Sequence, residues 1–371
     1  MRATGAVRVS AALIVRNEEA FLDGCLVSIA GAVDEIVVVD TGSTDRTMEI
    51  ARAHGATLIE RVWRDDFAWA RNEGLAAASG EWILYIDADE RLSLPPGAHL
   101  LDNLGDPNVV VGRVGFRPTL NATPYREYRL FRNDPRLRFK GSMHETILPD
   151  YEALKASIGA TEGESPAEIT HLGYEGDQMH KHRRNLPLLR SAIAAEPRRV
   201  YYWHHLSSTL AGLGEDEEAL AVAKAGMARV DRATATLTSD AVASMLAQTC
   251  AGLMHAAGED PLPMVEQGLA LYPGNRALEL VKARILLDQG RTAVALPILE
   301  VLAAIDSASY ADPVLAFDRR IFDVYAPDLR GVALLRLGRR EAAAEAFARA
   351  AAAAPEDMSY RVKAAALRRS A

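Results

Sequence analysis

An acidic turn with the residues Asp87-Ala88-Asp89-Glu90 directly follows the apolar segment Trp82–Ile86. Two carboxylates spaced two residues apart at the end of a strand can share one divalent cation. Hard cations such as Mg²⁺ prefer oxygen ligands and leave coordination positions for substrate phosphates, and their charge can stabilise a diphosphate leaving group. Aspartate is also common in ordinary turns, so the meaning of this turn depends on which other side chains the fold brings near it.

Two more polar turns follow strand-like segments. Asp40 comes directly after the β-branched run Glu35–Val39, and the residues behind it predict the start of a helix, whose N-terminus favours anions. The turn Arg16–Glu19 follows the segment Val7–Val15 in the same way. Helix capping alone would explain much of both turns, but it does not require Asp40. Three polar turns after three strands therefore predict one shared binding site.

The elements that must position these turns alternate between strand and helix patterns. The expected strands are Val7–Val15, Glu35–Val39, Ala56–Glu60 and Trp82–Ile86, and the expected helices are Glu19–Ala30, Asp45–His54 and Phe67–Ser79. This order predicts an α/β fold with a doubly wound, mostly parallel sheet, in which ligands bind at the carboxyl ends of the strands. We expect further strands or loops over Val109–Leu148 and a loop over the polar residues Lys155–Pro166.

The second half of the chain has helical patterns that repeat at a period near 34 residues. Three units carry matching residues, namely Leu210, Gly214 and Ala219, then Leu286, Gly290 and Ala295, then Leu334, Gly338 and Ala343. A looser unit lies at Thr249–Pro273. The pattern resembles tetratricopeptide repeats, in which helix pairs bury their apolar faces by stacking on their neighbours; an irregular helical bundle is the alternative. We expect an α/β domain over residues 1–195 and an all-α helical-repeat domain over residues 196–371.

Composition and charge exclude some classes of protein. The 371 residues include 42 Lys and Arg against 50 Asp and Glu, a net charge of −8, which disfavours broad binding to nucleic acids. The two cysteines, Cys25 and Cys250, lie far apart, so we expect no disulfide framework. No apolar run approaches the ~20 residues of a transmembrane helix. These features predict a cytoplasmic protein without a transmembrane segment, which acts at a membrane only peripherally.

Four motifs within Ala12–Leu92 resemble the nucleotide-binding half of a family 2 glycosyltransferase, which has the GT-A fold. The motifs are Leu13–Glu19, Val38–Asp45, Ala70–Gly74 and Gly80–Asp89. Within that family, the chain is similar to a branch that fuses the transferase to tetratricopeptide-like repeats. That branch includes lipopolysaccharide-core glucosyltransferases and peptide S-glycosyltransferases. The resemblance implies that the first domain is a catalytic domain that binds a nucleotide sugar.

The resemblance also implies a role for each matching residue. Glu18 and Asp40 would contact the nucleoside, with Asp40 at the base, and Arg71 would lie near the base or the diphosphate. Asp87 would contact the ribose or the metal, and Asp89 would bind the metal. On residue type alone, an arginine such as Arg71 is more often a surface residue of a helix.

Residues further along resemble the acceptor-side part of the same branch, in the segments Arg129–Arg132 and Phe139–Glu145. An inverting transfer needs a base that removes the acceptor proton. Many family members have an acidic pair where this chain has His144 and Glu145. We expect Glu145 to be the base, although His144 can do the same work near neutral pH and a salt bridge is the alternative for Glu145. His171 is placed where GT-A enzymes often carry a late histidine that completes the metal site; a structural histidine is the alternative.

The combined expectation is an inverting glycosyltransferase that depends on a divalent cation, Mg²⁺ or Mn²⁺. It would move a sugar from a nucleotide sugar, by resemblance a UDP-sugar, to a glycan, peptide or small-molecule acceptor, while the helical repeats position the acceptor or a protein partner. Two alternatives stay open. A nucleotidyltransferase acting on a sugar phosphate would carry a glycine-rich, arginine-containing loop after the first strand, where this chain has Arg16–Glu19. A non-catalytic repeat scaffold would not need acidic strand ends.

Overall fold

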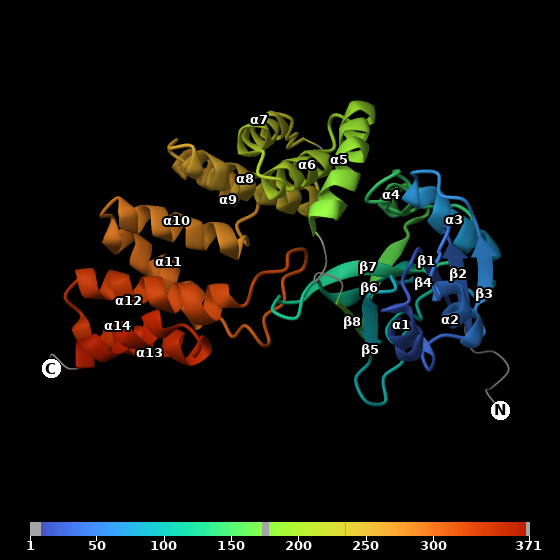
Figure 1. Cartoon of the computed structure of the whole chain (residues 1–371), viewed down its shortest axis with the longest axis horizontal. Coiled ribbons are helices and arrows are strands. Elements are labelled where there is room, and N and C mark those ends of the chain that lie inside the picture. Colours follow the sequence, from blue (N-terminus) through green and yellow to red (C-terminus); the bar gives the residue numbers. More distant parts are fainter. Residues whose placement is uncertain (1–8, 173–177, 234, 369–371) are drawn as a thin grey trace. The chain divides into compact units, whose positions relative to one another are not determined.

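The computed structural model describes residues 9–172, 178–233 and 235–368. The chain divides into two compact units. Figure 1 colours the chain by residue number, from blue at the N-terminus to red at the C-terminus. An α/β unit contains Met1–Leu120 and Tyr125–Gln178, and a helical unit contains Asn121–Pro124 and Met179–Ala371. The domain boundary expected between residues 195 and 196 stays a prediction.

One mixed sheet forms the centre of the α/β unit. Its strands are β1 (Val9–Val15), β2 (Glu35–Asp40), β3 (Thr57–Glu60), β4 (Trp82–Tyr85), β5 (Glu90–Ser93), β6 (Val109–Arg117), β7 (Tyr125–Arg132) and β8 (Thr161–His171). Their order in the sheet is β3-β2-β1-β4-β7-β6-β8-β5. The first four are parallel to one another, whereas β7 pairs antiparallel with both β4 and β6. The expected α/β fold of the GT-A type is confirmed.

Helices cover both faces of this sheet. They are α1 (Leu22–Ile29), α2 (Thr47–Ala53), α3 (Phe67–Ala77) and α4 (Leu148–Ile158). Because neighbouring residues of a strand point to opposite faces, Leu13 packs in one core with α1 and α2, whereas Ala12 packs in another with α3 and α4. The helix expected from Glu19 begins at Leu22 instead, and the backbone amide of Glu19 donates to Asp45 in the neighbouring turn.

The prediction of a loop over Lys155–Pro166 was wrong. Helix α4 continues through Lys155 and ends at Gly159, whose φ of 68° is left-handed, and strand β8 begins two residues later. Gly159 therefore ends the helix, whereas Gly163 and Pro166 lie within the strand. A side chain at Gly163 would lie 2.6 Å from Leu104. Pro166 lies where the register between β6 and β8 shifts, so its missing amide removes no ladder hydrogen bond that a regular strand would need.

The helical unit is built from consecutive helices. They are α5 (Gln178–Ala195), α6 (Val200–Gly212), α7 (Asp216–Met227), α8 (Leu237–Ala256), α9 (Leu262–Leu271), α10 (Arg276–Asp288), α11 (Thr292–Ala304), the π-helix η1 (Ile321–Tyr325), α12 (Ala326–Arg336), α13 (Arg340–Ala353) and α14 (Met358–Arg368). Helices α6 and α7, α8 and α9, α10 and α11, and α12 and α13 pack as pairs (Figure 1). Within the described residues, no helix is long and apolar enough to span a membrane.

Glycines fix the turns and the close packing of these pairs. Gly214, Gly290 and Gly338 follow the first helix of their pairs with φ near the left-handed region, at 79°, 75° and 77°. Gly331 lets α12 approach α13, because an added Cβ would lie 2.6 Å from the ring of Phe347. The paired helices coincide with the repeat units expected from the sequence, so the tetratricopeptide-like organisation is confirmed.

Candidate active site

The turns after β1 and β2 hold each other in place. The amide of Asn17 donates to Ser43 Oγ at 2.9 Å, and the amide of Thr44 donates to Asn17 Oδ1 at 2.7 Å. The next amide, that of Glu18, donates to Thr47 Oγ1 at 2.7 Å. Asn17 adopts a left-handed φ of 56°, which asparagine tolerates better than most residues. Two of the turns that the sequence predicted to converge are therefore joined by direct hydrogen bonds.

Asp40 ends β2 with one satisfied and one unsatisfied oxygen. Its Oδ1 accepts from the amides of Gly42 and Ser43 at 2.9 and 2.8 Å. Its Oδ2 is buried and accepts no hydrogen bond from any residue that the structure describes, and the residue is only 2% exposed. A buried acceptor without a partner costs about 1–3 kcal/mol. This oxygen is therefore suited to accept an N–H or O–H group of a ligand.

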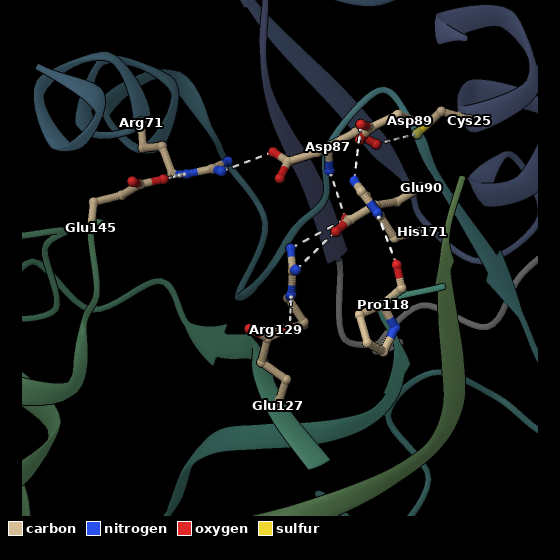
Figure 2. A network of polar contacts seen from close by, with 10 residues as sticks. All are labelled: Cys25, Arg71, Asp87, Asp89, Glu90, Pro118, Glu127, Arg129, Glu145 and His171. Atoms are coloured by element: carbon tan, nitrogen blue, oxygen red, sulfur yellow. Dashed lines mark hydrogen bonds and ion pairs between the residues drawn. The ribbon is translucent and has the colours of Figure 1, made fainter. Parts of the chain in front are cut away.

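Arg71 of α3 connects the end of β4 with the loop after β7 (Figure 2). Its Nη2 donates to Asp87 Oδ1 at 2.8 Å and its Nε donates to Glu145 Oε1 at 2.5 Å. Its Nη1 is buried, with no acceptor among the described residues. The guanidinium also lies 5.0 Å from the centre of the Tyr85 ring. Although burial opposes the charge, the two carboxylates raise the pKa of Arg71 above its usual value.

The acidic turn itself is held from below by a buried ion pair. Arg129 of β7 donates from Nη2 and Nη1 to Glu90 at 2.8 and 3.2 Å, and Glu90 Oε2 accepts the amide of Asp87 at 2.9 Å. Burial opposes ionisation of Asp87, but Arg71 and Arg129 outweigh it and lower the pKa of this carboxyl. Burial raises the pKa of Glu90 to about 7 in spite of Arg129. Asp87 is therefore ionised, with its charge directed to Arg71.

Asp89 and His171 form the part of the site that is suited to a cation. His171 Nε2 lies 3.0 Å from Asp89 Oδ2, and its Nδ1 lies 3.2 Å from the carbonyl oxygen of Pro118 (Figure 2). Burial lowers the pKa of His171, but the hydrogen bond and the charge of Asp89 raise it above its usual value. In a metal site, the carbonyl would keep the proton on Nδ1 and leave Nε2 as a ligand.

The described residues contain no cluster of three or more His, Cys, Asp or Glu side chains that could hold a metal. Asp89 nevertheless fits a cation of the Mg²⁺ or Mn²⁺ type, because such ions are often bound by one or two carboxylates and complete their shell with water and substrate phosphates. His171 would add a nitrogen ligand. Asp87 contacts Arg71 rather than this pair. Its role as a metal ligand stays a prediction.

The loop after β7 carries both candidate bases. Glu145 is bound to Arg71, and its side chain is only 11% exposed. His144 has a left-handed φ of 51°. An isolated bridge between Lys140 and Thr146 closes the loop around them. The salt bridge that the sequence offered as an alternative for Glu145 is thus present, and its role as a base stays a prediction.

A small hollow opens where these elements meet. Its empty volume is about 190 Å³, and its lining residues are Ala12, Leu13, Ile14, Arg71, Gly74, Tyr85 and Phe139.

The sequence missed the partners beneath the acidic turn. Arg129 was noticed only as part of a segment resembling an acceptor side, but its side chain is 7% exposed and lies against Glu90 and Glu127. Its ring neighbours are Tyr85 and Phe116, at 4.6 and 4.7 Å. Strand β7 also carries Arg126, Glu127 and Arg132, so residue type gave no sign that Arg129 is buried, and its partner could not be predicted from local spacing.

Comparisons with known proteins show what the α/β unit is similar to. Residues 10–153 match the family model described as Glycosyl transferase family 2. A TPR repeat-containing protein of Synechococcus elongatus is 37% identical over 228 residues, which cover 59% of this chain and 56% of that protein. Glycosyltransferase SunS of Bacillus subtilis is 29% identical over 57% of this chain and 51% of SunS.

A third relative matches a shorter part of the chain. The lipopolysaccharide core biosynthesis glycosyltransferase LpsC of Rhizobium meliloti is 32% identical over 41% of this chain and 61% of LpsC. The chain thus spans about half the length of the curated relatives it matches. Residues 10–153 of this chain are therefore similar to glycosyl transferase family 2.

Proposed function

We propose that this chain is an inverting, metal-dependent glycosyltransferase that moves a sugar from a nucleotide sugar, UDP-linked, to an acceptor. The observation that carries the proposal is the contact between Asp89 and His171 at the carboxyl end of the parallel strands. The carboxylate of Asp89 and the imidazole of His171 could bind a cation. The buried guanidinium of Arg71, near the acidic turn, could bind a diphosphate.

The nucleoside would bind at the ends of β1 and β2. The unsatisfied Oδ2 of Asp40 would accept an N–H group of the base, and Glu18 would contact the nucleoside from the neighbouring turn. The buried Nη1 of Arg71 has no hydrogen-bond acceptor among the described residues, which suits a diphosphate oxygen because guanidinium groups bind phosphates well. Uracil and thymine each have one ring N–H flanked by carbonyl groups, which fits a single carboxylate acceptor, so the choice of UDP as the carrier rests on the family resemblance.

Asp89 and His171 would hold the divalent cation, with Asp87 directed to the ribose or the cation. Bound there, the cation would offset the charge that develops on the diphosphate as its bond to the sugar breaks. His171 would bind through Nε2 and give up the proton that it shares with Asp89, so cation binding would be weaker at low pH.

The transfer itself would be a direct displacement. The acceptor nucleophile would form a bond to the anomeric carbon while the bond between that carbon and the diphosphate oxygen breaks, which inverts the configuration. Glu145 would take the proton of the acceptor, and His144 is the alternative base in the same loop. Arg71 contacts both Glu145 and Asp87, so it would connect the base with the donor side of the site.

The helical unit would support the acceptor or a protein partner in the cytoplasm or at a membrane surface. The relative LpsC is named for lipopolysaccharide core biosynthesis, so a glycan acceptor is one class to test, beside peptides and small molecules.

A donor panel tests the function directly. UDP-, GDP- and dTDP-sugars are incubated with the full chain, with Mg²⁺, Mn²⁺ or a chelator, and binding is measured by calorimetry and donor hydrolysis by nucleotide release. We expect cation-dependent binding and slow hydrolysis of UDP-sugar, reduced more than about tenfold in Asp89→Asn. Glu164→Gln is the matched control, because this carboxylate lies in an exposed ion pair with Arg126.

The other classes give different results in the same assay. If no nucleotide sugar binds or reacts with either cation, the proposal fails. Release of pyrophosphate from UTP and a sugar phosphate would instead favour a nucleotidyltransferase. A scaffold would bind its partner equally well with and without the Asp89 substitution.

A further inference from the structure

The ion pair of Glu90 and Arg129 is buried beside the acidic turn, and hydrogen bonds and aromatic rings hold both side chains in place. Both side chains are almost fully buried, at 2% and 7% exposed. Arg129 uses all three of its donor nitrogens, two on Glu90 and Nε on Glu127 at 2.9 Å. Its guanidinium is enclosed by the rings of Tyr85 and Phe116. A pair this completely satisfied has one well-defined position.

The pair is attached to the acidic turn at two points. Glu90 Oε2 accepts the amide of Asp87 at 2.9 Å, and the amide of Glu90 donates to the carbonyl oxygen of Asp87 at 3.0 Å. In the ladder between β5 and β8, Glu90 is the residue opposite His171. The amide of Leu172 next to it donates to the carbonyl oxygen of Asp89 at 2.8 Å. The ion pair thus lies beneath the residues whose side chains form the proposed cation site (Figure 2).

We propose that Glu90 and Arg129 are positioning residues that set the spacing between Asp89 and His171 for a divalent cation. This inference rests on the proposed function. Neither residue touches the cation or the donor. Arg129 fixes the carboxylate of Glu90, Glu90 fixes the amide of Asp87, and the turn then presents Asp89 toward His171. Groups that orient metal ligands in this way affect metal affinity by about 10–100-fold.

Mn²⁺ binding in the presence of UDP separates this role from a purely structural one. The full chain is titrated with Mn²⁺ and free Mn²⁺ is measured by electron paramagnetic resonance, while thermal unfolding reports stability. Glu90→Ala, which removes the acceptor for the Asp87 amide, is expected to raise the Kd for Mn²⁺ by about 10–100-fold. Glu90→Gln keeps an acceptor oxygen without the charge, so it is expected to give an intermediate Kd.

Glu162→Ala is the matched control. Glu162 of β8 accepts from Arg113 and from Tyr128 on the same sheet, so its loss also removes a carboxylate from an ion pair. It does not touch the acidic turn, and the Kd for Mn²⁺ is expected to stay within about twofold of the wild type. UDP binding without a cation is expected to be the same in all three folded variants.

The outcomes are distinct. If folded Glu90→Ala binds Mn²⁺ as tightly as the wild type, the positioning role is refuted while the proposed function stands. If Glu90→Ala does not fold, Glu90→Gln decides, and an unchanged Kd refutes the role. If the wild type with UDP binds no Mn²⁺, the proposed function fails and this inference fails with it.

Discussion

Replacing Arg71 by methionine tests whether its buried guanidinium links Asp87, on the donor side of the site, to Glu145 in the loop after β7. Methionine keeps much of the side-chain volume but removes both hydrogen bonds, to Asp87 at 2.8 Å and to Glu145 at 2.5 Å. The two carboxylates would then lie in the site without their common partner.

The size of the effect follows from burial. The side chains of Arg71 and Glu145 are 8% and 11% exposed, whereas that of Asp87 is 37% exposed. Breaking a buried pair by removing one partner costs about 3–5 kcal/mol, while a solvent-screened pair is worth about 0–1 kcal/mol. We therefore expect Arg71→Met to lower the free energy of unfolding by about 3–5 kcal/mol, with most of the coupling to Glu145.

Urea unfolding of a double-mutant cycle measures that coupling. Arg71→Met, Glu145→Gln and the double variant are compared, and the cycle is repeated with Asp87→Asn. The coupling with Glu145 is expected to be about 2–3 kcal/mol and that with Asp87 about 1 kcal/mol or less. Arg113→Met is the control, because its pair with Glu162 is longer, at 3.5 Å. A loss below about 1 kcal/mol for Arg71→Met, or no coupling to Glu145, would refute the reasoning.

Three further predictions concern other parts of the chain. Burial lowers the pKa of His204 to about 4. Between pH 6.5 and pH 4 the unfolded chain therefore binds a proton at this histidine that the folded chain does not bind. The free energy of unfolding falls as the pH drops through that window. His204→Phe should remove roughly 2 kcal/mol of the difference in unfolding free energy between pH 7.5 and pH 5, measured by urea unfolding; an unchanged difference contradicts the assignment. Gly331→Ala should destabilise the helical unit by about 1–3 kcal/mol, because the new methyl group would clash with Phe347. Gly252→Ala should stabilise it by up to about 1 kcal/mol, because an added Cβ there has no atom within 4 Å. If thermal unfolding does not separate the two variants, the close packing of α12 on α13 is refuted. Asp40→Asn should weaken UDP binding by about tenfold, the loss of one charged hydrogen bond, without loss of stability, and calorimetry that finds equal affinity removes Asp40 from the base site.

The local part of the site was predictable from the sequence. The acidic turn, Asp40 and the turn after β1 each follow a short apolar run, and the alternating order of strands and helices places such turns at one edge of the sheet. The repeat units were predictable because their turn glycines have the same neighbours, a leucine four residues before and an alanine five residues after, as around Gly290 and Gly338. Element ends were less certain, as the late start of α1 shows. The turn before this helix is held by a hydrogen bond from the amide of Glu19 to Asp45, 26 residues further along the chain.

The partners that hold the site required the fold. Glu90 and Arg129 lie 39 residues apart and meet only because β7 pairs with β4 and β5 pairs with β8. Strand β8 was missed because its composition is polar and it contains Pro166, which a register shift accommodates. His171 was identified only through a family resemblance, since nothing in its local sequence predicts that it lies opposite Glu90.

The position of the cation is the most direct test of the whole account. Crystals of the full chain soaked with UDP and MnCl₂ can be measured at the manganese absorption edge, where an anomalous peak locates the ion. We expect one peak about 2.1 Å from an oxygen of Asp89, with His171 Nε2 and the UDP phosphates as further ligands. Bound UDP with no peak beside Asp89, or with the ion held elsewhere, would contradict the account.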